Sequence, residues 1–263
     1  MSGTKNRNTA PTGNAKASGT TARPGTVDVY TVAMDGTKTY IDCVMDKTKL
    51  AFFSRAGDRV LNPDKYSKYG AMGLKKDYNK DLAPAKRAPP VHELLLGPGV
   101  NKLAGEIVIK FINDNSVAQP KPFSLDFSLF GKDAEDIPFE KLLKVHHAMS
   151  TFDLERQHAG RVVRDTIFKY IDQRDDRMAP NASDFKACME IIDFDGGIVS
   201  RFMTQIMWRS VNKNIHQGVL DEIKEYCRET ERYSTMVTLG EGVVEKKMAA
   251  RTQPGGKPLE HGW

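Results

Sequence analysis

The feature that most constrains the fold of this chain is a change of hydrophobic period near Asp136. Before that residue, the apolar residues gather in short segments that alternate with polar ones or are rich in β-branched residues, a pattern typical of strands. After it, apolar residues recur every three or four positions over longer segments, which predicts helices. The sequence therefore predicts an α+β protein in which a small antiparallel β-domain is followed by a helical bundle.

The first half is expected to contain five strands. The expected strands are 27–34, 38–45, 49–55, Glu106–Ile112 and 123–130. Asp35-Gly36 is a signal for a tight hairpin turn between the first two, and VHELLLGPGVNKLAG is expected to supply one or two short helices before the fourth. This order is compatible with a five-stranded barrel of the oligonucleotide-binding type, whose groove and loops bind single strands.

The second half is expected to be helical throughout. The first helix covers about 138–149, and Ser150 with Asp153 has the spacing of a capping box, which predicts a second helix running to about Asp175. Asn181 is expected to cap a third helix. Its residues Phe185, Cys188, Met189 and Ile192 are expected to face the core. Two further sets of residues each indicate a helix: Ile198, Phe202, Ile206 and Met207; Val219, Leu220, Ile223, Tyr226 and Cys227. The first of these two sets, with Val211, belongs to the most apolar helix, which we place at the centre of the bundle.

These patterns divide the chain into four regions. We expect a disordered basic arm at 1–26, a β-rich domain at 27–135 with a basic loop at 62–90, a helical domain at 136–233, and a flexible tail at 234–263. The arm is rich in Thr, Gly, Asn, Ala and Ser, and residues of these types bury too little apolar surface to offset the entropy lost on ordering.

Positive charge is concentrated in the regions expected to be flexible. Residues 1–26 carry +4 with no acidic residue, 65–87 carry +5, and 245–263 carry +2. These three segments together carry +11, so the remainder of the chain carries −6, because the whole chain carries +5. Basic arms of this kind neutralise phosphates and bind nucleic acid in a salt-dependent way.

The loop at 65–90 also carries aromatic residues among its lysines. Tyr66, Tyr69 and Tyr78 alternate with seven basic residues. Cations that follow a phosphate backbone, combined with rings on which bases stack, are the chemistry of single-strand binding without sequence preference. A solvated surface loop is the alternative. A second candidate surface is the arginine face of the 150–175 helix, at Arg161 and Arg164, where pairing with acids of the same helix is the alternative.

The string IIDFDGGIV, from Ile191 to Val199, resembles the first motif of the haloacid-dehalogenase-type phosphatases. The resemblance implies that Asp193 would attack a phosphoryl group and Asp195 would act as acid and base, with magnesium between them. Gly197 stands where that family usually has Thr or Val, and the flanks have helical periodicity although such a nucleophile needs a strand end. The competing interpretation is a helix that stops at Gly196-Gly197.

Other catalytic and metal chemistry has little support in the sequence. Cys43, Cys188 and Cys227 form no CxxC pair and stand among apolar residues, which predicts buried thiols. His146, His147 and His158 lack the HExxH spacing, and a histidine on an apolar helix face more often belongs to the core. We therefore expect no enzyme activity, no cofactor and no metal.

These observations favour a structural protein that coats single-stranded nucleic acid, with RNA preferred, and assembles with copies of itself, as a viral nucleocapsid or coat protein does. The alternatives are a replication-type single-strand-binding protein that uses the barrel and, with less support, the magnesium-dependent phosphatase. The residues expected to bind nucleic acid are Lys5, Arg7, Lys16, Arg23, Lys65, Tyr66, Lys68, Tyr69, Lys75, Lys76, Tyr78, Lys80, Lys86, Arg87, Arg161 and Arg164.

The expected location is cytoplasmic or elsewhere inside the cell with access to the nucleus, and in the virion if the chain is viral. The basis is that the sequence contains no run of 18 apolar residues and that the first residues lack the apolar middle of a secretory signal. For the same reason, no membrane partner is expected.

Overall fold

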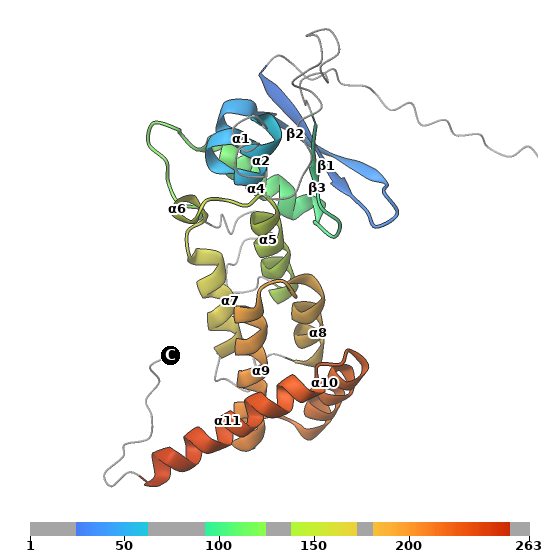
Figure 1. Cartoon of the computed structure of the whole chain (residues 1–263), viewed down its shortest axis with the longest axis vertical. Helices are drawn as coiled ribbons and strands as arrows, with labels where there is room; N and C mark the ends of the chain where they lie inside the picture. Colours follow the sequence, from blue (N-terminus) through green and yellow to red (C-terminus); the bar gives the residue numbers. More distant parts are fainter. Residues whose placement is uncertain (1–24, 63–92, 125–137, 173–180, 253–263) are drawn as a thin grey trace, which may run out of the picture.

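A computed structural model describes residues 25–62, 93–124, 138–172 and 181–252 of the chain. A small open sheet near the N-terminus is followed by a series of helices, and the sheet and helices α10 and α11 lie at opposite ends of an elongated molecule (Figure 1). The strands are β1 Thr26–Val32, β2 Lys38–Asp46 and β3 Glu93–Leu96. The helices are α1 Lys47–Phe53, α2 Arg55–Leu61, α4 Lys102–Asp114, α5 Phe139–Thr151, α6 Arg156–Ala159, α7 Val162–Asp172, α8 Ala182–Ile191, α9 Gly196–Val211, α10 Gln217–Glu229 and α11 Tyr233–Thr252.

The first two strands form the predicted hairpin. They pair antiparallel, with Val29 opposite Ile41, and Gly36 takes a φ of +84° in the connection, a backbone conformation that suits glycine. The connection runs from Ala33 to Thr37, longer than the predicted two-residue turn. The third strand, β3, pairs parallel with β1 on its other side, so the order of the described sheet is β2-β1-β3.

The predicted barrel is wrong, because two of its five strands are helices and the sheet is not closed. The segment 49–55 belongs to α1 and α2, each of which begins at a side-chain cap: Asp46 accepts a hydrogen bond from the Lys49 N–H, and Ser54 accepts one from the Gly57 N–H. The segment predicted to supply one or two short helices before the fourth strand contains β3 and, from Lys102, the start of α4. The predicted strand at 123–130 lies outside the described residues from 125 onward.

Glu106–Ile112, predicted as a strand, lies inside α4. Asn101 caps this helix through the Ala104 N–H. Helix α4 packs against β2 on one side and α5 on the other, and Ile107, Val108 and Ile109 are all buried. A helix covered on two sides is apolar around most of its circumference, and its sequence then resembles that of a buried strand.

The predicted long helix at 150–175 is divided into α6 and α7, and the predicted capping box is wrong. Ser150 lies in the last turn of α5, and Asp153 has a φ of +48°. The division falls at Gly160, whose φ is +65° and where a Cβ atom would lie 2.7 Å from the Phe123 carbonyl oxygen. The Phe123 N–H also donates to the His158 carbonyl, so the passing chain at Phe123 occupies the space that a continuous helix would need.

The remaining helices confirm the predicted periodicity. Asn181 and Asp184 form a capping box at the start of α8, and the four predicted inward-facing residues of that helix are buried. The predicted helices around Phe202 and Ile223 are α9 and α10. The pattern that weakens beyond Tyr233 nevertheless forms a 20-residue helix, α11, where the sequence predicted a flexible segment.

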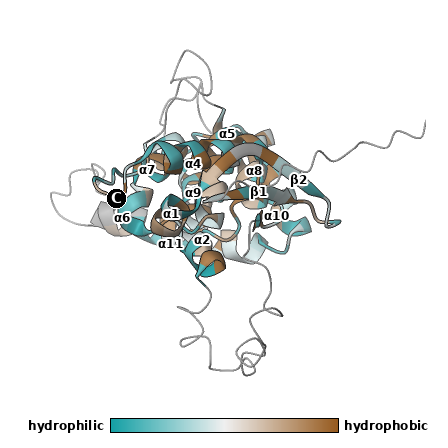
Figure 2. Ribbon diagram, turned by 90° about the horizontal axis from the view of Figure 1, so that it is seen from above, coloured by the Kyte–Doolittle hydropathy of each residue, from teal (hydrophilic) through white to brown (hydrophobic). Residues whose placement is uncertain are grey.

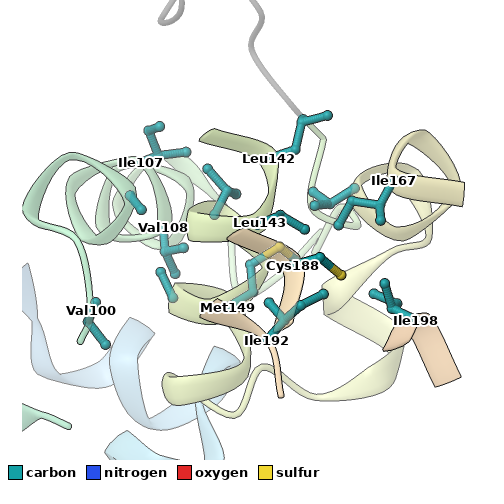
Figure 3. Packing of buried hydrophobic residues seen from close by; sticks show 14 of the residues in the cluster. Val100, Ile107, Val108, Leu142, Leu143, Met149, Ile167, Cys188, Ile192 and Ile198 are labelled. Carbon is teal, nitrogen blue, oxygen red and sulfur yellow. The ribbon is translucent and has the colours of Figure 1, made fainter. Parts of the chain in front are cut away.

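One cluster of buried side chains connects the sheet to the helices, from Val27 of β1 to Met236 of α11. In its middle, side chains from α4, α5, α7, α8 and α9 converge (Figure 3). Viewed from above, polar and apolar segments alternate along the helices, as amphipathic packing requires (Figure 2). The proposed division of the chain into domains stays a prediction.

The corner between α1 and α2 is tied to the corner after α5. Ser54 donates its hydroxyl to the Phe152 carbonyl, and Arg55 forms an ion pair with Asp153 at 2.6 Å. An isolated β-bridge joins Ser54 to Leu154. These contacts hold the sheet-bearing end against the helical end. None of the described helices has the length and apolar character needed to cross a lipid bilayer.

Candidate nucleic-acid interface

Most of the residues predicted to bind nucleic acid lie outside the described part of the chain. These are the basic residues of the arm and every predicted residue of the 65–87 segment. The described chain leaves α2 at Asn62 and resumes at Glu93, the first residue of β3. The role of this loop therefore stays a prediction. The two predicted residues that the structure describes are Arg161 and Arg164.

Arg161 and Arg164 lie at the start of α7. The carbonyl of Arg161 accepts a hydrogen bond from the Asp165 N–H, and its exposed side chain has no ion pair with any described residue. The Arg164 guanidinium lies 3.4 Å from an oxygen of Asp195 and 5.3 Å from the ring centroid of Phe168. Its side chain is 48% exposed, so it remains accessible from solvent.

The pairing partner of Arg164 therefore differs from the predicted alternative. That alternative was an acid of the same helix, but Asp195 comes from the turn between α8 and α9. Asp172, another acid of α7, pairs instead with Arg201 of α9, and Gln205 donates to it at 3.0 Å. Arg164 and Asp172 of α7 thus form ion pairs with residues at the start of α9 and within it, and not with each other or with other residues of α7.

Asp195 organises the turn at 193–197. One of its oxygens accepts hydrogen bonds from the Gly197 and Ile198 N–H groups, which makes it the N-cap of α9. The other oxygen lies 3.0 Å from His146 Nε2 on α5. The hydrogen bond from His146, the backbone N–H of Ile198 and the charge of Arg164 outweigh burial and lower the pKa of Asp195 to about 2. Gly196 and Gly197 therefore open α9, and the predicted helix stop at these glycines is wrong.

The neighbouring Phe194 presents its ring to solvent. This residue is 53% exposed, although its ring is supported by two imidazoles. The ring centroid of His146 lies 6.1 Å away at an interplanar angle of 15°, and that of His147 lies 5.4 Å away at 35°. Partial burial and the charge of His146 lower the pKa of His147. The result is an exposed aromatic ring, held by α5, in the same turn that the guanidinium of Arg164 contacts through Asp195.

Asp193, the other acid of the string, forms an ion pair with Arg232 at 2.6 Å. The phosphatase motif requires its first aspartate at the end of a strand, but Asp193 and Asp195 lie in the turn between helices α8 and α9. In the described part of the chain, no group of three or more His, Cys, Asp or Glu side chains is arranged to hold a metal ion. His146 pairs with Asp195, whereas the buried His158 packs against the rings of Phe52 and Phe53.

The structure describes the side chains of two of the three cysteines, and both are buried thiols, as the sequence predicted. Cys188 and Cys227 are free and buried. Burial raises the pKa of Cys188 to about 12, and it raises that of Cys227 as well, so both are neutral thiols near pH 7. They belong to the core.

The sequence interpretation missed Phe194 as a candidate ligand-binding residue. The signal was present, because an aromatic residue between two aspartates and before two glycines stands in a turn, where its ring has little opportunity to be buried. The partners of that turn come from three separate segments: His146 from α5, Arg164 from α7, and Arg232 from the connection between α10 and α11. No local pattern could have brought them together.

No family model matches this chain, and neither the curated proteins nor the solved structures contain a match to it.

Proposed function

We propose that this chain coats single-stranded nucleic acid, RNA in preference to DNA, and assembles with copies of itself as a nucleocapsid or coat protein. The observation that carries this proposal is the separation of charge along the sequence. Three segments carry +11 in total, and the remainder carries −6. A binding surface made of basic segments neutralises phosphates without reading the sequence of bases, which is what a coat requires.

The turn at 193–197 supports the proposal within the described part of the chain. Its exposed Phe194 ring offers a face on which an unpaired base can stack, and stacking of this kind contributes about 1–3 kcal/mol per base. Arg164 lies beside the same turn, where its guanidinium can contact the adjoining phosphate. A ring and a cation at one turn can bind one nucleotide. The basic segments would then neutralise the phosphates of the rest of the strand.

The carboxylates at this turn do not oppose such binding. Asp195 is paired with His146 and Arg164, and Asp193 is paired with Arg232. Each negative charge therefore has a cation against it, and the phosphate of an approaching strand meets little uncompensated negative charge. The replication-protein alternative depended on a barrel, and the described sheet is open, so we favour the coat.

The test is the affinity of the purified protein for a fluorescent single-stranded RNA, measured by anisotropy over a series of salt concentrations. The logarithm of the affinity should fall linearly with the logarithm of the salt concentration. The change Lys75→Glu with Lys76→Glu should remove two phosphate contacts and reduce the steepness of that line by about 1.4. Phe194→Ala should weaken binding by about 5- to 150-fold, whereas Phe194→Trp should retain it.

The matched controls make the same changes elsewhere on the molecule. Lys110→Glu with Lys121→Glu reverses two exposed lysines outside the basic segments, and Leu95→Ala removes an apolar side chain of similar exposure. Both should bind nearly as tightly as the wild type. No binding at low salt, a salt-independent affinity, or equal losses in the variants and the controls would contradict the proposal. Closed or helical particles in electron microscopy with RNA would support a coat, and loose beaded filaments would favour the replication-type protein.

A further inference from the structure

Helix α11 carries apolar side chains on two of its faces. Met236 and Val243 are buried toward the body of the molecule, and Gly240 allows a close approach to α9, since a Cβ atom there would overlap the Met207 methyl carbon. Val237 and Val244 lie elsewhere on the helix and are 37% and 41% exposed. These two valines are seven residues apart, so they lie on one face, two turns from each other.

The exposed valines line an open pocket between α9, α10 and α11. The pocket has a volume of about 550 Å³, and Met207 and Val211 of α9 line it together with Val237 and Val244. The pocket therefore lies where α11 packs against the end of α9. Helices α10 and α11 are at the end of the molecule opposite the sheet (Figure 1). An apolar pocket at the extremity of an elongated chain is accessible to another protein without hindrance from the sheet.

Charges of both signs line the same pocket. Lys224 comes from α10, whereas Glu241 and Glu245 come from α11 and lie one turn apart. Within the part of the chain that the structure describes, none of these three side chains forms an ion pair. A partner that covers the pocket must therefore supply a negative charge opposite Lys224 and positive charge opposite the two glutamates.

We propose that this pocket is the contact between two copies of the chain, which dock α11 against α11 about a two-fold axis. In a contact of this symmetry, the same patch meets itself, and residue i of one copy faces residue j of the other while j faces i. Lys224 of each copy then meets Glu241 and Glu245 of the other, and the valines of each copy cover those of the other. The patch is complementary to itself in charge, which is the reason to choose a second copy over an unrelated apolar partner.

This inference rests on the self-assembly in the proposed function and names the surface that performs it. The dimer formed through α11 leaves the turn at 193–197 at the other end of α9, since that turn contains the N-cap and the first two residues of the helix and the pocket is lined by Met207 and Val211 from its last turns. The nucleic-acid contact and the contact between copies therefore use separate parts of the molecule.

The test is a charge reversal followed by its compensation, with the mass of the nucleic-acid-free full-length chain measured by sedimentation equilibrium. Lys224→Glu alone should raise the dimer dissociation constant about tenfold or more, because three like charges then face one another across the contact. Glu241→Lys with Glu245→Lys should weaken the dimer for the same reason. The triple variant, which exchanges the signs on both sides, should restore it.

Two controls separate this contact from general effects of charge and exposure. Lys213→Glu reverses an exposed lysine outside the pocket, and Leu103→Ser removes an apolar side chain that is 44% exposed on α4. Neither should change the dissociation constant. A monomeric wild type at all accessible concentrations, reversals without effect, or a triple variant as weak as its parents would overturn the inference.

The result can be distinguished from a failure of the proposed function. Anisotropy with an RNA oligonucleotide that is long enough for one chain only reports binding without assembly. If the reversal variants bind this oligonucleotide as the wild type does and their mass is also unchanged, the α11 contact is wrong and the nucleic-acid proposal stands. If the reversals dissociate the dimer and the wild type binds no RNA, the contact is correct and the nucleic-acid proposal fails.

Discussion

The two ends of helix α9 differ in where their side chains find contacts. At its start, Asp195 has a specific partner for each oxygen, drawn from α5, α7 and the backbone of α9 itself. At its other end, Met207 and Val211 line a pocket that the described residues leave open. Polar groups that leave water need partners at defined distances, so the chain supplies them internally. Apolar contact is non-directional, and another molecule can complete it.

The first test of this comparison removes a buried side chain from the middle of α9, because the packing there positions both ends of the helix. Phe202 is fully buried, and its ring lies 5.3 Å from that of Phe185 and 5.8 Å from that of Phe139. Phe202→Ala should lower the free energy of unfolding by about 3–5 kcal/mol, because it removes buried apolar surface and leaves a cavity. Urea unfolding followed by circular dichroism measures this loss.

The exposed Phe194 serves as the control for Phe202. Because its ring is 53% exposed, Phe194→Ala should cost less than about 1 kcal/mol of stability. Equal losses in the two variants would mean that the middle of α9 is no better packed than its surface turn.

The second test removes the charge at the start of α9 without removing the cap. Asparagine is as good an N-cap as aspartate, so Asp195→Asn isolates the ionic contribution. The pKa of Asp195 is lowered to about 2 from 3.8, and each unit corresponds to about 1.4 kcal/mol, so we expect a loss of about 2 kcal/mol at pH 7. At the other end, Lys224→Gln should change stability by less than about 0.5 kcal/mol at protein concentrations where the chain is monomeric, since within one copy its side chain forms no ion pair with the described residues.

Similar losses from Asp195→Asn and Lys224→Gln would remove the distinction between the two ends. The two variants are compared in the same urea titration at low salt, where charge effects are largest.

The third test follows the same carboxyl group with pH. A carboxyl group with a lowered pKa in the folded state stabilises that state while it is ionised in both the folded and the unfolded chain. The contribution of Asp195 is therefore full above about pH 4 and is lost as the pH falls toward about 2. The difference in stability between the wild type and Asp195→Asn should shrink over this interval and vanish below it.

Unfolding midpoints at closely spaced pH values, measured in parallel for both proteins, provide the comparison. Two curves that remain parallel from pH 4 to pH 2 would show that the ion pairs of Asp195 contribute nothing to folding.

Helices α8, α9 and α10 could be predicted from the sequence because their signals are local. Asn181 and Asp184 form the cap of α8 within one turn, and Phe185, Cys188 and Met189 recur at helical spacing. Each of these helices has a buried face and an exposed one, so the period is visible in the residues.

The two failures in the first half have physical causes. In α4, burial on two sides hides the helical period, and β-branched residues then suggest a strand. Around Ser54, two seven-residue helices are too short to show a clear period, and their caps are the better signal. The break at Gly160 depends on Phe123, which lies far away in the sequence.

The candidate site was predicted only in part. The sequence indicated Arg161 and Arg164, and the structure describes both as exposed at the start of α7. It did not indicate Phe194. The alternative to nucleic-acid binding by Arg164 was pairing with acids of its own helix, whereas its partner is Asp195 from another segment.

By itself, the sequence determined the separation of basic segments from an acidic remainder, the first hairpin and the capped amphipathic helices, because charge and period are properties of neighbouring residues. Only the tertiary structure decided that the sheet stays open, that α5, α7 and the turn before α9 meet at Asp195, and that α11 leaves two valines uncovered. The physical reason is that the partners of a buried charge and the cover of an apolar face are chosen by packing between distant segments, for which no local pattern exists.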